Sequence, residues 1–412
     1  MKIAFFTDSY YPMLNGVTIS VENFAHELRS HGHTVYIFAP KFDGYKDTEK
    51  DVYRLSAVKL LSTEPEVHMP FVLPHNLFKE ISPRDFDIVH AHGNGFFSFL
   101  GYQVAKLKGI PYVLTVHTQH TRYTHYVFNG KLITPRIAAT GLRVISNMCD
   151  EVITPSLKMK KDLKSYGVTK PITVISNFIY TARFRSAKKN YLHDLCNIPP
   201  SSPILLSVGR LGKEKDCSFL LRSFKVIANQ NPNVHLVMVG DGEEAKSLKS
   251  LVKKLGLGGR VHFPGKVHPK EIPSVYADAE IFVYSSRTET QGIVVLEAAA
   301  AGLPFVVVKD DAYAGCIIDG ENGYMVSHKP MLFAQKVLEL LDDAKKRENF
   351  SKKSRELIRA NFLPTALANE TLEVYKRVLL KKNSGRFRIR NINKATLKRL
   401  YRATELLNKI FE

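Results

Sequence analysis

The feature that most constrains this chain is a repeated alternation of short apolar strands with amphipathic helices. Strands rich in valine, isoleucine and leucine that alternate with helices predict parallel sheets covered by helices on both faces. The first run of strands is expected at Lys2–Thr7, Thr34–Ala39, Asp87–His90, Tyr112–His117, Glu151–Thr154 and Ile172–Ile175. The second run is expected at Ile204–Gly209, His235–Gly240, Val261–Pro264, Glu280–Ser285, Phe305–Lys309 and Gly323–Val326. Two such runs predict an α/β protein with two doubly wound domains that face a cleft.

A polar segment separates the two runs. At 412 residues the chain is long enough for two domains with complete cores, and residues 183–203 are rich in lysine, asparagine, serine and proline. We therefore expect one Rossmann-like domain over residues 1–180 and a second over residues 181–364. A helix over residues 365–380 is expected to return to the first domain, and residues 381–412 are expected to form a basic helical tail.

The net charge of the chain is strongly positive, at +20. Such a charge implies a negatively charged partner: a nucleic acid, an anionic membrane surface or a phosphorylated ligand. The first residues are typical of a strand rather than a signal peptide, and no apolar run is long enough to span a bilayer, so any membrane contact is expected to be peripheral. Four widely spaced cysteines argue against a zinc site or a disulfide framework and favour a reducing cytoplasm. They are Cys149, Cys196, Cys217 and Cys316.

Two carboxylates stand close together where a predicted strand passes into a predicted helix. Glu289 is expected on the connecting loop and Glu297 in the first turns of the helix, with Gly292 between them. Backbone N–H groups at a loop glycine before a helix form a favourable anion site, and carboxylates accept hydrogen bonds from sugar hydroxyls. This combination favours a ligand that is part phosphate and part sugar.

Two cations and a further glycine follow other predicted strands. Arg210 and Lys215 come after the strand Ile204–Gly209, where a guanidinium and an ammonium together could neutralise a diphosphate. A solvated basic loop is the alternative. Gly16 lies after the first strand and before a helix expected from about residue 20, so backbone could approach a ligand there. An ordinary turn glycine is the alternative at that position.

Histidines cluster after two other strands. His117, His120 and His125 are spaced by three and five residues with no nearby acid, which argues against a metal site. His117 is expected at a strand tip, where it could donate a hydrogen bond to a substrate. His90 and His92 lie at another strand end, and either could be structural.

Gly16, Arg210, Lys215 and the pair Glu289 and Glu297 together resemble the retaining glycosyltransferases of family four, which have the GT-B fold. The resemblance covers about residues 1–380. Residues 11–17 and 289–292 are similar more narrowly to the diacylglycerol glucosyltransferase branch of that family.

The resemblance implies a donor site in the second domain. Arg210 and Lys215 would hold the donor diphosphate, and Glu297 would accept hydrogen bonds from the ribose hydroxyls. Val267 would meet the nucleobase through its backbone. Backbone N–H groups would bind the sugar and the β-phosphate at Thr290, Gln291, Gly292 and Ile293.

The resemblance also implies two candidate catalytic residues and a contribution from the first domain. Glu289 would contact hydroxyls of the transferred sugar, and His117 would bind that sugar near the reacting carbon. Gly16 would approach the donor from the first domain. The donor would be UDP-glucose and the acceptor a membrane lipid, diacylglycerol; another glycolipid or a soluble glycan stays open as acceptor. Because cations and N–H groups would stabilise the leaving diphosphate, the implied reaction needs no metal ion and no other cofactor.

The last 32 residues hold ten basic and two acidic side chains, which contribute +8 of the +20. If residues 393–411 are helical, apolar side chains share one face and basic side chains the other, as suits an anionic membrane surface. This predicts a peripheral protein on the cytoplasmic membrane face. A helix docked on its own domain and a flexible tail are the alternatives. The predicted membrane-binding residues are Arg386, Arg388, Arg390, Lys398, Arg399 and Arg402.

A function of another class, nucleic-acid binding, would also use the positive charge. The sequence contains no RNA-binding aromatic motif, zinc finger or helix-turn-helix pattern. We therefore expect no nucleic acid partner.

Overall fold

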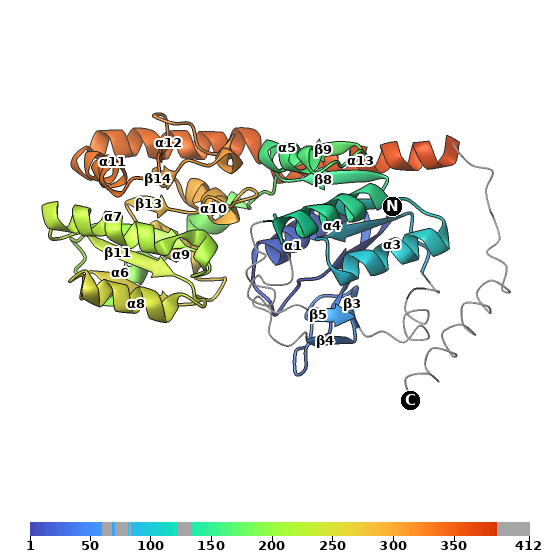
Figure 1. The fold of residues 1–412 in the computed structure, drawn as a ribbon, viewed down its shortest axis with the longest axis horizontal. Coiled ribbons are helices and arrows are strands. Elements are labelled where there is room, and N and C mark those ends of the chain that lie inside the picture. Colours follow the sequence, from blue (N-terminus) through green and yellow to red (C-terminus); the bar gives the residue numbers. More distant parts are fainter. Residues whose placement is uncertain (60–67, 71–80, 82–83, 120, 122–133, 385–412) are drawn as a thin grey trace. The chain divides into compact units, whose positions relative to one another are not determined.

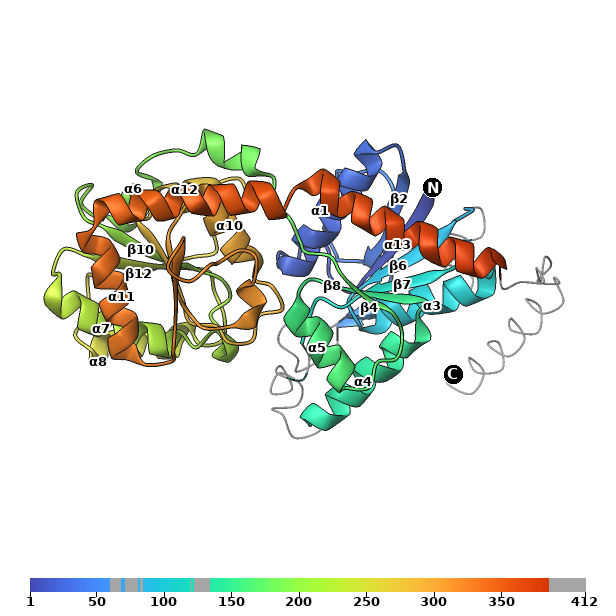
Figure 2. The same cartoon turned by 90° about the horizontal axis from the view of Figure 1, so that it is seen from above.

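The computed structural model describes residues 1–59, 68–70, 81, 84–119, 121 and 134–384. The chain divides into two compact units (Figures 1 and 2). The first unit is formed by Met1–Ser176 and the chain from Thr365, and the second by Asn177–Pro364.

The first unit contains a seven-stranded parallel sheet in the order β3-β2-β1-β6-β7-β8-β9. Its strands are β1 (Lys2–Thr7), β2 (Thr34–Pro40), β3 (Val52–Leu55), β6 (Ile88–His92), β7 (Tyr112–Thr115), β8 (Glu151–Thr154) and β9 (Ile172–Val174). A separate antiparallel pair consists of β4 (Ala57–Lys59) and β5 (His68–Pro70). The described helices are α1 (Gly16–Ser30), α3 (Phe96–Lys108), α4 (Pro135–Met148), α5 (Leu157–Ser165) and α13 (Pro364–Ser384).

The second unit contains a six-stranded parallel sheet in the order β12-β11-β10-β13-β14-β15. Its strands are β10 (Ile204–Val208), β11 (His235–Val239), β12 (Val261–Gly265), β13 (Ile281–Tyr284), β14 (Phe305–Val308) and β15 (Gly323–Val326). The α-helices are α6 (Tyr191–Cys196), α7 (Cys217–Gln230), α8 (Ala245–Lys254), α9 (Ile272–Ala277), α10 (Ile293–Ala301), α11 (Pro330–Asp342) and α12 (Ala344–Asn361). The 3-10 helices are η4 (Thr181–Ser186), η5 (Lys213–Lys215) and η6 (Asp311–Tyr313).

The central strands are buried along their whole length. All five residues of β10 are buried, and so are all four of β13 and of β14. A strand with helices on both faces must place every side chain in an apolar layer, which explains its unbroken run of aliphatic residues. One large apolar cluster fills each unit, within residues 4–172 in the first and 205–350 in the second.

The prediction of two parallel-sheet α/β domains is confirmed. Each of the twelve strands expected from the sequence is present, and the differences lie at the edges. Strands β3, β4 and β5 were not expected from the sequence. Helix α1 begins at Gly16 rather than near residue 20, because the Asn15 side chain caps it by accepting from the N–H groups of Val17 and Thr18, at 3.0 and 3.1 Å.

Helix α13 packs on the first unit, although it follows the second unit in the chain. The Tyr375 hydroxyl lies 2.6 Å from Nδ1 of His90, and the Thr365 hydroxyl donates to Glu27 at 3.0 Å. Arg377 forms an ion pair with the buried carboxylate of Glu151. Within the described residues, no helix combines the length and the apolar character needed to cross a bilayer.

Candidate active site

The candidate site of the second unit lies where its strand order changes direction. Strand β10 pairs with β11 on one side and with β13 on the other, so the chain winds away from β10 in both directions. The loops that follow β10 and β13 therefore diverge from one edge of the sheet, the usual ligand position in doubly wound folds. Lys215 belongs to the first of these connections and Glu289 to the second.

Lys215 and Glu289 form a short, largely buried ion pair. Nζ of Lys215 lies 2.5 Å from Oε1 of Glu289, and the Tyr284 hydroxyl donates to the same oxygen at 3.0 Å. Burial alone would raise the pKa of Glu289, but the Lys215 ammonium and hydrogen bonds from Lys215, Ser286 and Tyr284 outweigh it and hold that pKa below its ordinary value. Glu289 is therefore ionised at neutral pH, and Lys215 balances its charge.

Glu297 is equally buried, but no cation of the described residues lies beside it as Lys215 lies beside Glu289. Its Oε2 accepts a hydrogen bond from the Tyr276 hydroxyl at 2.9 Å. Burial raises the pKa of Glu297 to about 7, and the opposing effects of Tyr276 and of the more distant Arg183 are smaller. The Glu297 carboxyl can therefore exist in both protonation states near neutral pH.

The start of helix α10 presents backbone donors beside this ion pair. Gly292 precedes the helix with φ of 80°, and no side chain caps the helix there. Its missing Cβ would lie 3.3 Å from Cγ2 of Val295 and 3.6 Å from Glu289. Because the first N–H groups of a helix lack intrahelical acceptors, the start of α10 can receive an anion.

Gln291 has a structural partner that its sequence position did not suggest. Its Oε1 accepts from the backbone N–H of Asn177 at 2.7 Å and from the side-chain amide of Asn177 at 2.8 Å. The Gln291 side chain thus connects the loop to the first residue of the second unit. The donor role expected for Gln291 concerns its backbone N–H, which this contact does not use.

The loop after β10 is fixed by a close backbone contact with Gly240 and by a hydrogen bond within the loop. A Cβ at Gly240 would lie 1.9 Å from the Gly209 carbonyl oxygen, so only glycine allows this approach. Arg210 donates to Glu214 at 2.7 Å, which fixes the guanidinium on the same loop as Lys215. Val267 is half-buried after β12, whose last residue accepts from the N–H of Gly240 at 2.9 Å.

In the first unit, His92, the last residue of β6, lies beside His117, which follows β7. Nε2 of His117 is 3.1 Å from Nδ1 of His92, and the two rings are stacked. Burial lowers the pKa of His117 to about 4, so the imidazole is neutral at pH 7. The ring of His90 instead bonds on both sides, to Tyr375 and to Thr115, each at 2.6 Å, which is a structural role.

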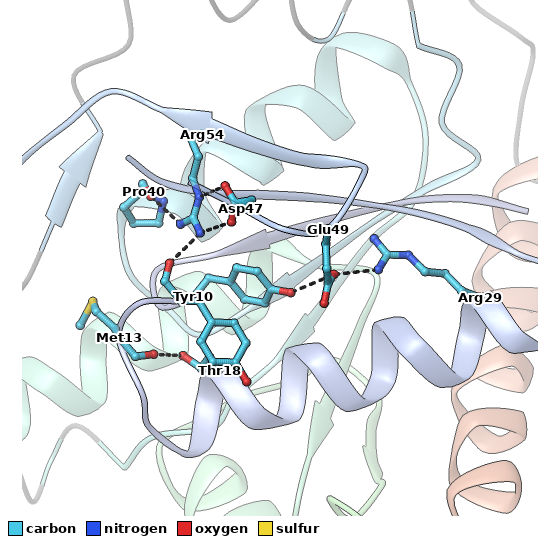
Figure 3. A network of polar contacts seen from close by, with 9 residues as sticks. Tyr10, Met13, Thr18, Arg29, Pro40, Asp47, Glu49 and Arg54 are labelled. Atoms are coloured by element: carbon cyan, nitrogen blue, oxygen red, sulfur yellow. Dashed lines mark hydrogen bonds and ion pairs between the residues drawn. The ribbon is translucent and has the colours of Figure 1, made fainter. Parts of the chain in front are cut away.

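Gly16 is the first residue of α1. The loop before this helix is held by Arg54 (Figure 3). Arg54 donates to the Tyr11 carbonyl at 2.6 Å, to the Pro40 carbonyl at 2.8 Å and twice to Asp47. Sequence reasoning missed Arg54 because the residue belongs to the short, unexpected strand β3. The sequence around an arginine in such a strand does not indicate which distant loop the side chain contacts.

The structure thus brings Lys215 and Glu289 into contact and places Arg210, Glu297 and the start of α10 in the same unit. Gly16 and His117 belong to the first unit. Sequence reasoning missed the partners Tyr276, Tyr284 and Glu214. The basic residues predicted to bind a membrane, Arg386 to Arg402, lie outside the described residues. In the part of the chain that the structure describes, no group of three histidine, cysteine, aspartate or glutamate residues could hold a metal ion.

Comparison with known proteins agrees with this geometry. The family model "Glycosyl transferases group 1" matches residues 193–357, and the model "Glycosyltransferase Family 4" matches residues 14–183. The alpha-monoglucosyldiacylglycerol synthase of Streptococcus pneumoniae is 30% identical over 318 residues, covering 74% of this chain and 70% of that protein. The enzyme of the same name from Acholeplasma laidlawii is 29% identical over 336 residues, covering 78% and 84%.

Solved structures show the same fold at low sequence identity. Sucrose-phosphate synthase from Thermosynechococcus elongatus matches with a TM-score of 0.74 at 19% identity, covering 92% of this chain and 99% of that chain. Anabaena HepE in complex with UDP-glucose matches with a TM-score of 0.73 at 18% identity, covering 92% and 100%. The fold of the chain is therefore GT-B.

Proposed function

Because the chain belongs to the group 1, family 4 glycosyltransferases, we propose that it transfers glucose from UDP-glucose to a membrane lipid, diacylglycerol, with retention of configuration. The observation that carries the proposal is the buried Lys215–Glu289 pair beside the uncapped start of α10. This arrangement offers positive charge and N–H donors for a diphosphate and an ionised carboxylate for sugar hydroxyls.

The proposed reaction develops negative charge on the leaving diphosphate, next to the cations and N–H groups of the site. As the bond between the anomeric carbon and the β-phosphate oxygen breaks, negative charge grows on the leaving UDP. Arg210, Lys215 and the N–H groups at α10 are proposed to stabilise that charge without the help of a metal ion. The acceptor hydroxyl attacks from the side of the leaving group, and a phosphate oxygen takes its proton, so configuration is retained.

The two glutamates and His117 have separate proposed roles. Glu289 stays ionised, because Lys215 and Tyr284 stabilise its carboxylate. This carboxylate is proposed to accept hydrogen bonds from hydroxyls of the transferred glucose. Glu297, with its pKa near 7, accepts from the ribose hydroxyls. The neutral imidazole of His117 donates a hydrogen bond to the glucose.

A lipid acceptor is supported by the two relatives from S. pneumoniae and A. laidlawii, which are alpha-monoglucosyldiacylglycerol synthases. The net charge of +20 also favours binding to an anionic membrane surface. We propose that the protein binds peripherally to the cytoplasmic membrane face, partly through residues 381–412.

The direct test is a transfer assay with the full-length protein. Radiolabelled UDP-glucose, UDP-galactose and GDP-mannose are each offered with diacylglycerol in phosphatidylglycerol vesicles, with a glycolipid, or with a soluble glycan. We expect label from UDP-glucose in a lipid product whose new bond is α-configured by NMR. Transfer confined to the soluble glycan would contradict the acceptor, a β-linked product would contradict retention, and loss of activity with EDTA would contradict metal independence.

A further inference from the structure

The second unit carries a hollow that is separate from the loops described above. It has a volume of about 130 Å³ and lies among η4, the end of α10 and α12. Its polar lining comes from four side chains and its apolar lining includes two more. These are Thr181, Arg185, Arg355, Arg359, Phe184 and Ile358.

The charge of this hollow is entirely positive. Three guanidinium groups line it, and none of the described residues that line it is acidic. Among the residues that the structure describes, neither Arg185 nor Arg359 makes a side-chain hydrogen bond or ion pair. The helix dipole places roughly half a negative charge at the end of α10, which the charge of three cations exceeds. The hollow therefore favours an anion.

Arg355 is already fixed in place before any ligand binds. It donates to the Ala301 carbonyl at 2.9 Å and to the Ser351 hydroxyl at 2.7 Å. Its guanidinium lies over Gly302, where a Cβ would be 2.2 Å from Cζ. Because this arginine is ordered by the protein itself, a ligand that contacts it loses little further side-chain entropy.

We propose that this hollow binds a phosphate group, supplied either by free phosphate or by the headgroup of an anionic phospholipid. Guanidinium groups match phosphate oxygens with paired N–H donors, and the Thr181 hydroxyl adds a further donor. The hollow lies at the opposite end of α10 from Gly292. A nine-residue helix is about 13 Å long, so one phosphate group cannot occupy both places.

The hollow is lined by segments near both ends of the second unit. Helix η4 begins four residues after the unit starts at Asn177, and α12 ends three residues before Pro364. A bound phosphate group holds these first and last segments together through Arg185 and Arg359. It therefore stabilises the folded unit in proportion to its occupancy.

The test is thermal unfolding of the full-length protein in inorganic phosphate, with sodium chloride at matched ionic strength as reference. We expect phosphate at about a hundred times its Kd to raise Tm by about 3 °C or more. The double variant R185Q/R359Q should lose this rise. The control R222Q should keep this rise, because Arg222 is an exposed residue of α7 that forms no side-chain hydrogen bond or ion pair with any described residue.

A further variant separates this hollow from the proposed donor site. If the phosphate effect arises at the start of α10, R210Q abolishes it and R185Q/R359Q does not, which overturns the proposal. Binding of UDP, measured by calorimetry, should be unchanged in R185Q/R359Q. The proposal thus stands or falls independently of the glycosyl transfer.

Vesicle binding identifies the source of the phosphate group. Flotation is measured with phosphatidylglycerol–phosphatidylcholine vesicles and with phosphatidylcholine alone. If R185Q/R359Q loses both the Tm rise and binding to the anionic vesicles while R222Q keeps both, the source is a lipid headgroup. If only the Tm rise is lost, the source is free phosphate. If R185Q/R359Q keeps the Tm rise, the hollow is not a phosphate site, whatever its vesicle binding.

Discussion

Glu289 and Glu297 are eight positions apart and equally buried, and burial acts to raise the pKa of both, yet their net pKa shifts are opposite. Glu289 has an ammonium at 2.5 Å, which lowers its pKa despite burial. The close polar partner of Glu297 among the described residues is the Tyr276 hydroxyl, and burial raises the pKa of Glu297 to about 7. One carboxyl is therefore a fixed charge and the other a group that titrates near neutral pH.

The raised pKa of Glu297 predicts a pH-dependent stability. Its folded pKa of about 7 exceeds the ordinary value of 4.5, so the folded state binds more protons between these two values. The stability that the protonated carboxyl contributes is complete below pH 4.5 and is lost as pH rises to 7. At about 1.4 kcal/mol per pH unit, E297Q should gain about 3 kcal/mol on the unsubstituted protein between pH 4.5 and pH 7.

Urea unfolding of both proteins at pH 4.5, 5.5 and 7.5 measures this difference. Other titrating groups are common to both chains and cancel in the comparison. A stability difference that does not change with pH would contradict the raised pKa.

The ion pair predicts a non-additive pair of substitutions. K215M or E289Q alone leaves a buried charge without its partner, at a cost of about 3 kcal/mol of unfolding free energy. K215M/E289Q removes both charges and should be less destabilised than the sum of the two. Transfer should fall about 100-fold or more in every variant, because the proposed donor contacts are lost. Recovery of turnover in the double variant would show that the pair is only structural.

The position of the glutamates could be predicted from the sequence, but their partners could not. A strand, a glycine and a helix in succession indicate a loop at the sheet edge. Tyr276 and Tyr284 belong to α9 and β13, where a tyrosine equally suggests an apolar core. Only the fold brings their hydroxyls to the carboxylates.

At the scale of elements, α10 begins without a capping side chain and is a core helix along most of its length. Its residues from Val295 to Ala300 are buried, and it begins at a glycine with positive φ. Such a conformation costs other residues about 1–2 kcal/mol. The helix start is therefore specified by Gly292 rather than by a capping side chain.

This predicts that G292A weakens the protein and its donor site together. The added Cβ adopts an unfavourable backbone conformation and lies 3.3 Å from Val295. We expect about 1–2 kcal/mol of lost stability and about tenfold weaker UDP binding, or about 1.4 kcal/mol. Calorimetry and urea unfolding measure both. G258A is the matched control, since a Cβ there meets no atom within 4 Å; equal effects in both variants would reject the role of Gly292.

The sequence pattern predicted the central strands of the sheets better than the edge strand β3. The central strands are long apolar runs, whereas β3 has four residues and includes Arg54. The Arg54 side chain anchors the loop before α1 (Figure 3). A single polar residue with a long-range structural role contributes nothing to a hydrophobic pattern. The sequence therefore predicted neither β3 nor the contact between Arg54 and the loop.

At the scale of the whole molecule, the charge is concentrated at the end of the chain. Residues 385–412 carry eight basic and two acidic side chains, whereas Lys382 in α13 donates to the Ile110 carbonyl and is structural. Removal of residues 385–412 should therefore leave the helix intact. It should weaken binding to phosphatidylglycerol vesicles about tenfold or more, since each basic residue near such a surface contributes about 1 kcal/mol. UDP binding should not change, and equal vesicle binding would contradict a membrane role for the tail.

The chain path also predicts how the two units fold alone. The second unit is continuous from Asn177 to Pro364 and contains its own core. The first unit is completed by α13, whose buried side chains come from the far end of the chain. The apolar ones are Leu367, Ala368, Leu372, Val374, Tyr375 and Val378.

A fragment of residues 177–364 should therefore unfold in one cooperative thermal transition. A fragment of residues 1–176 should not, because the apolar surface under α13 is exposed and the buried carboxylate of Glu151 loses Arg377. Adding a peptide of residues 364–384 should restore a cooperative transition, and the same peptide with Y375A and R377A should not. Calorimetry measures each case. Cooperative unfolding of residues 1–176 without the peptide would show that α13 is dispensable to that unit.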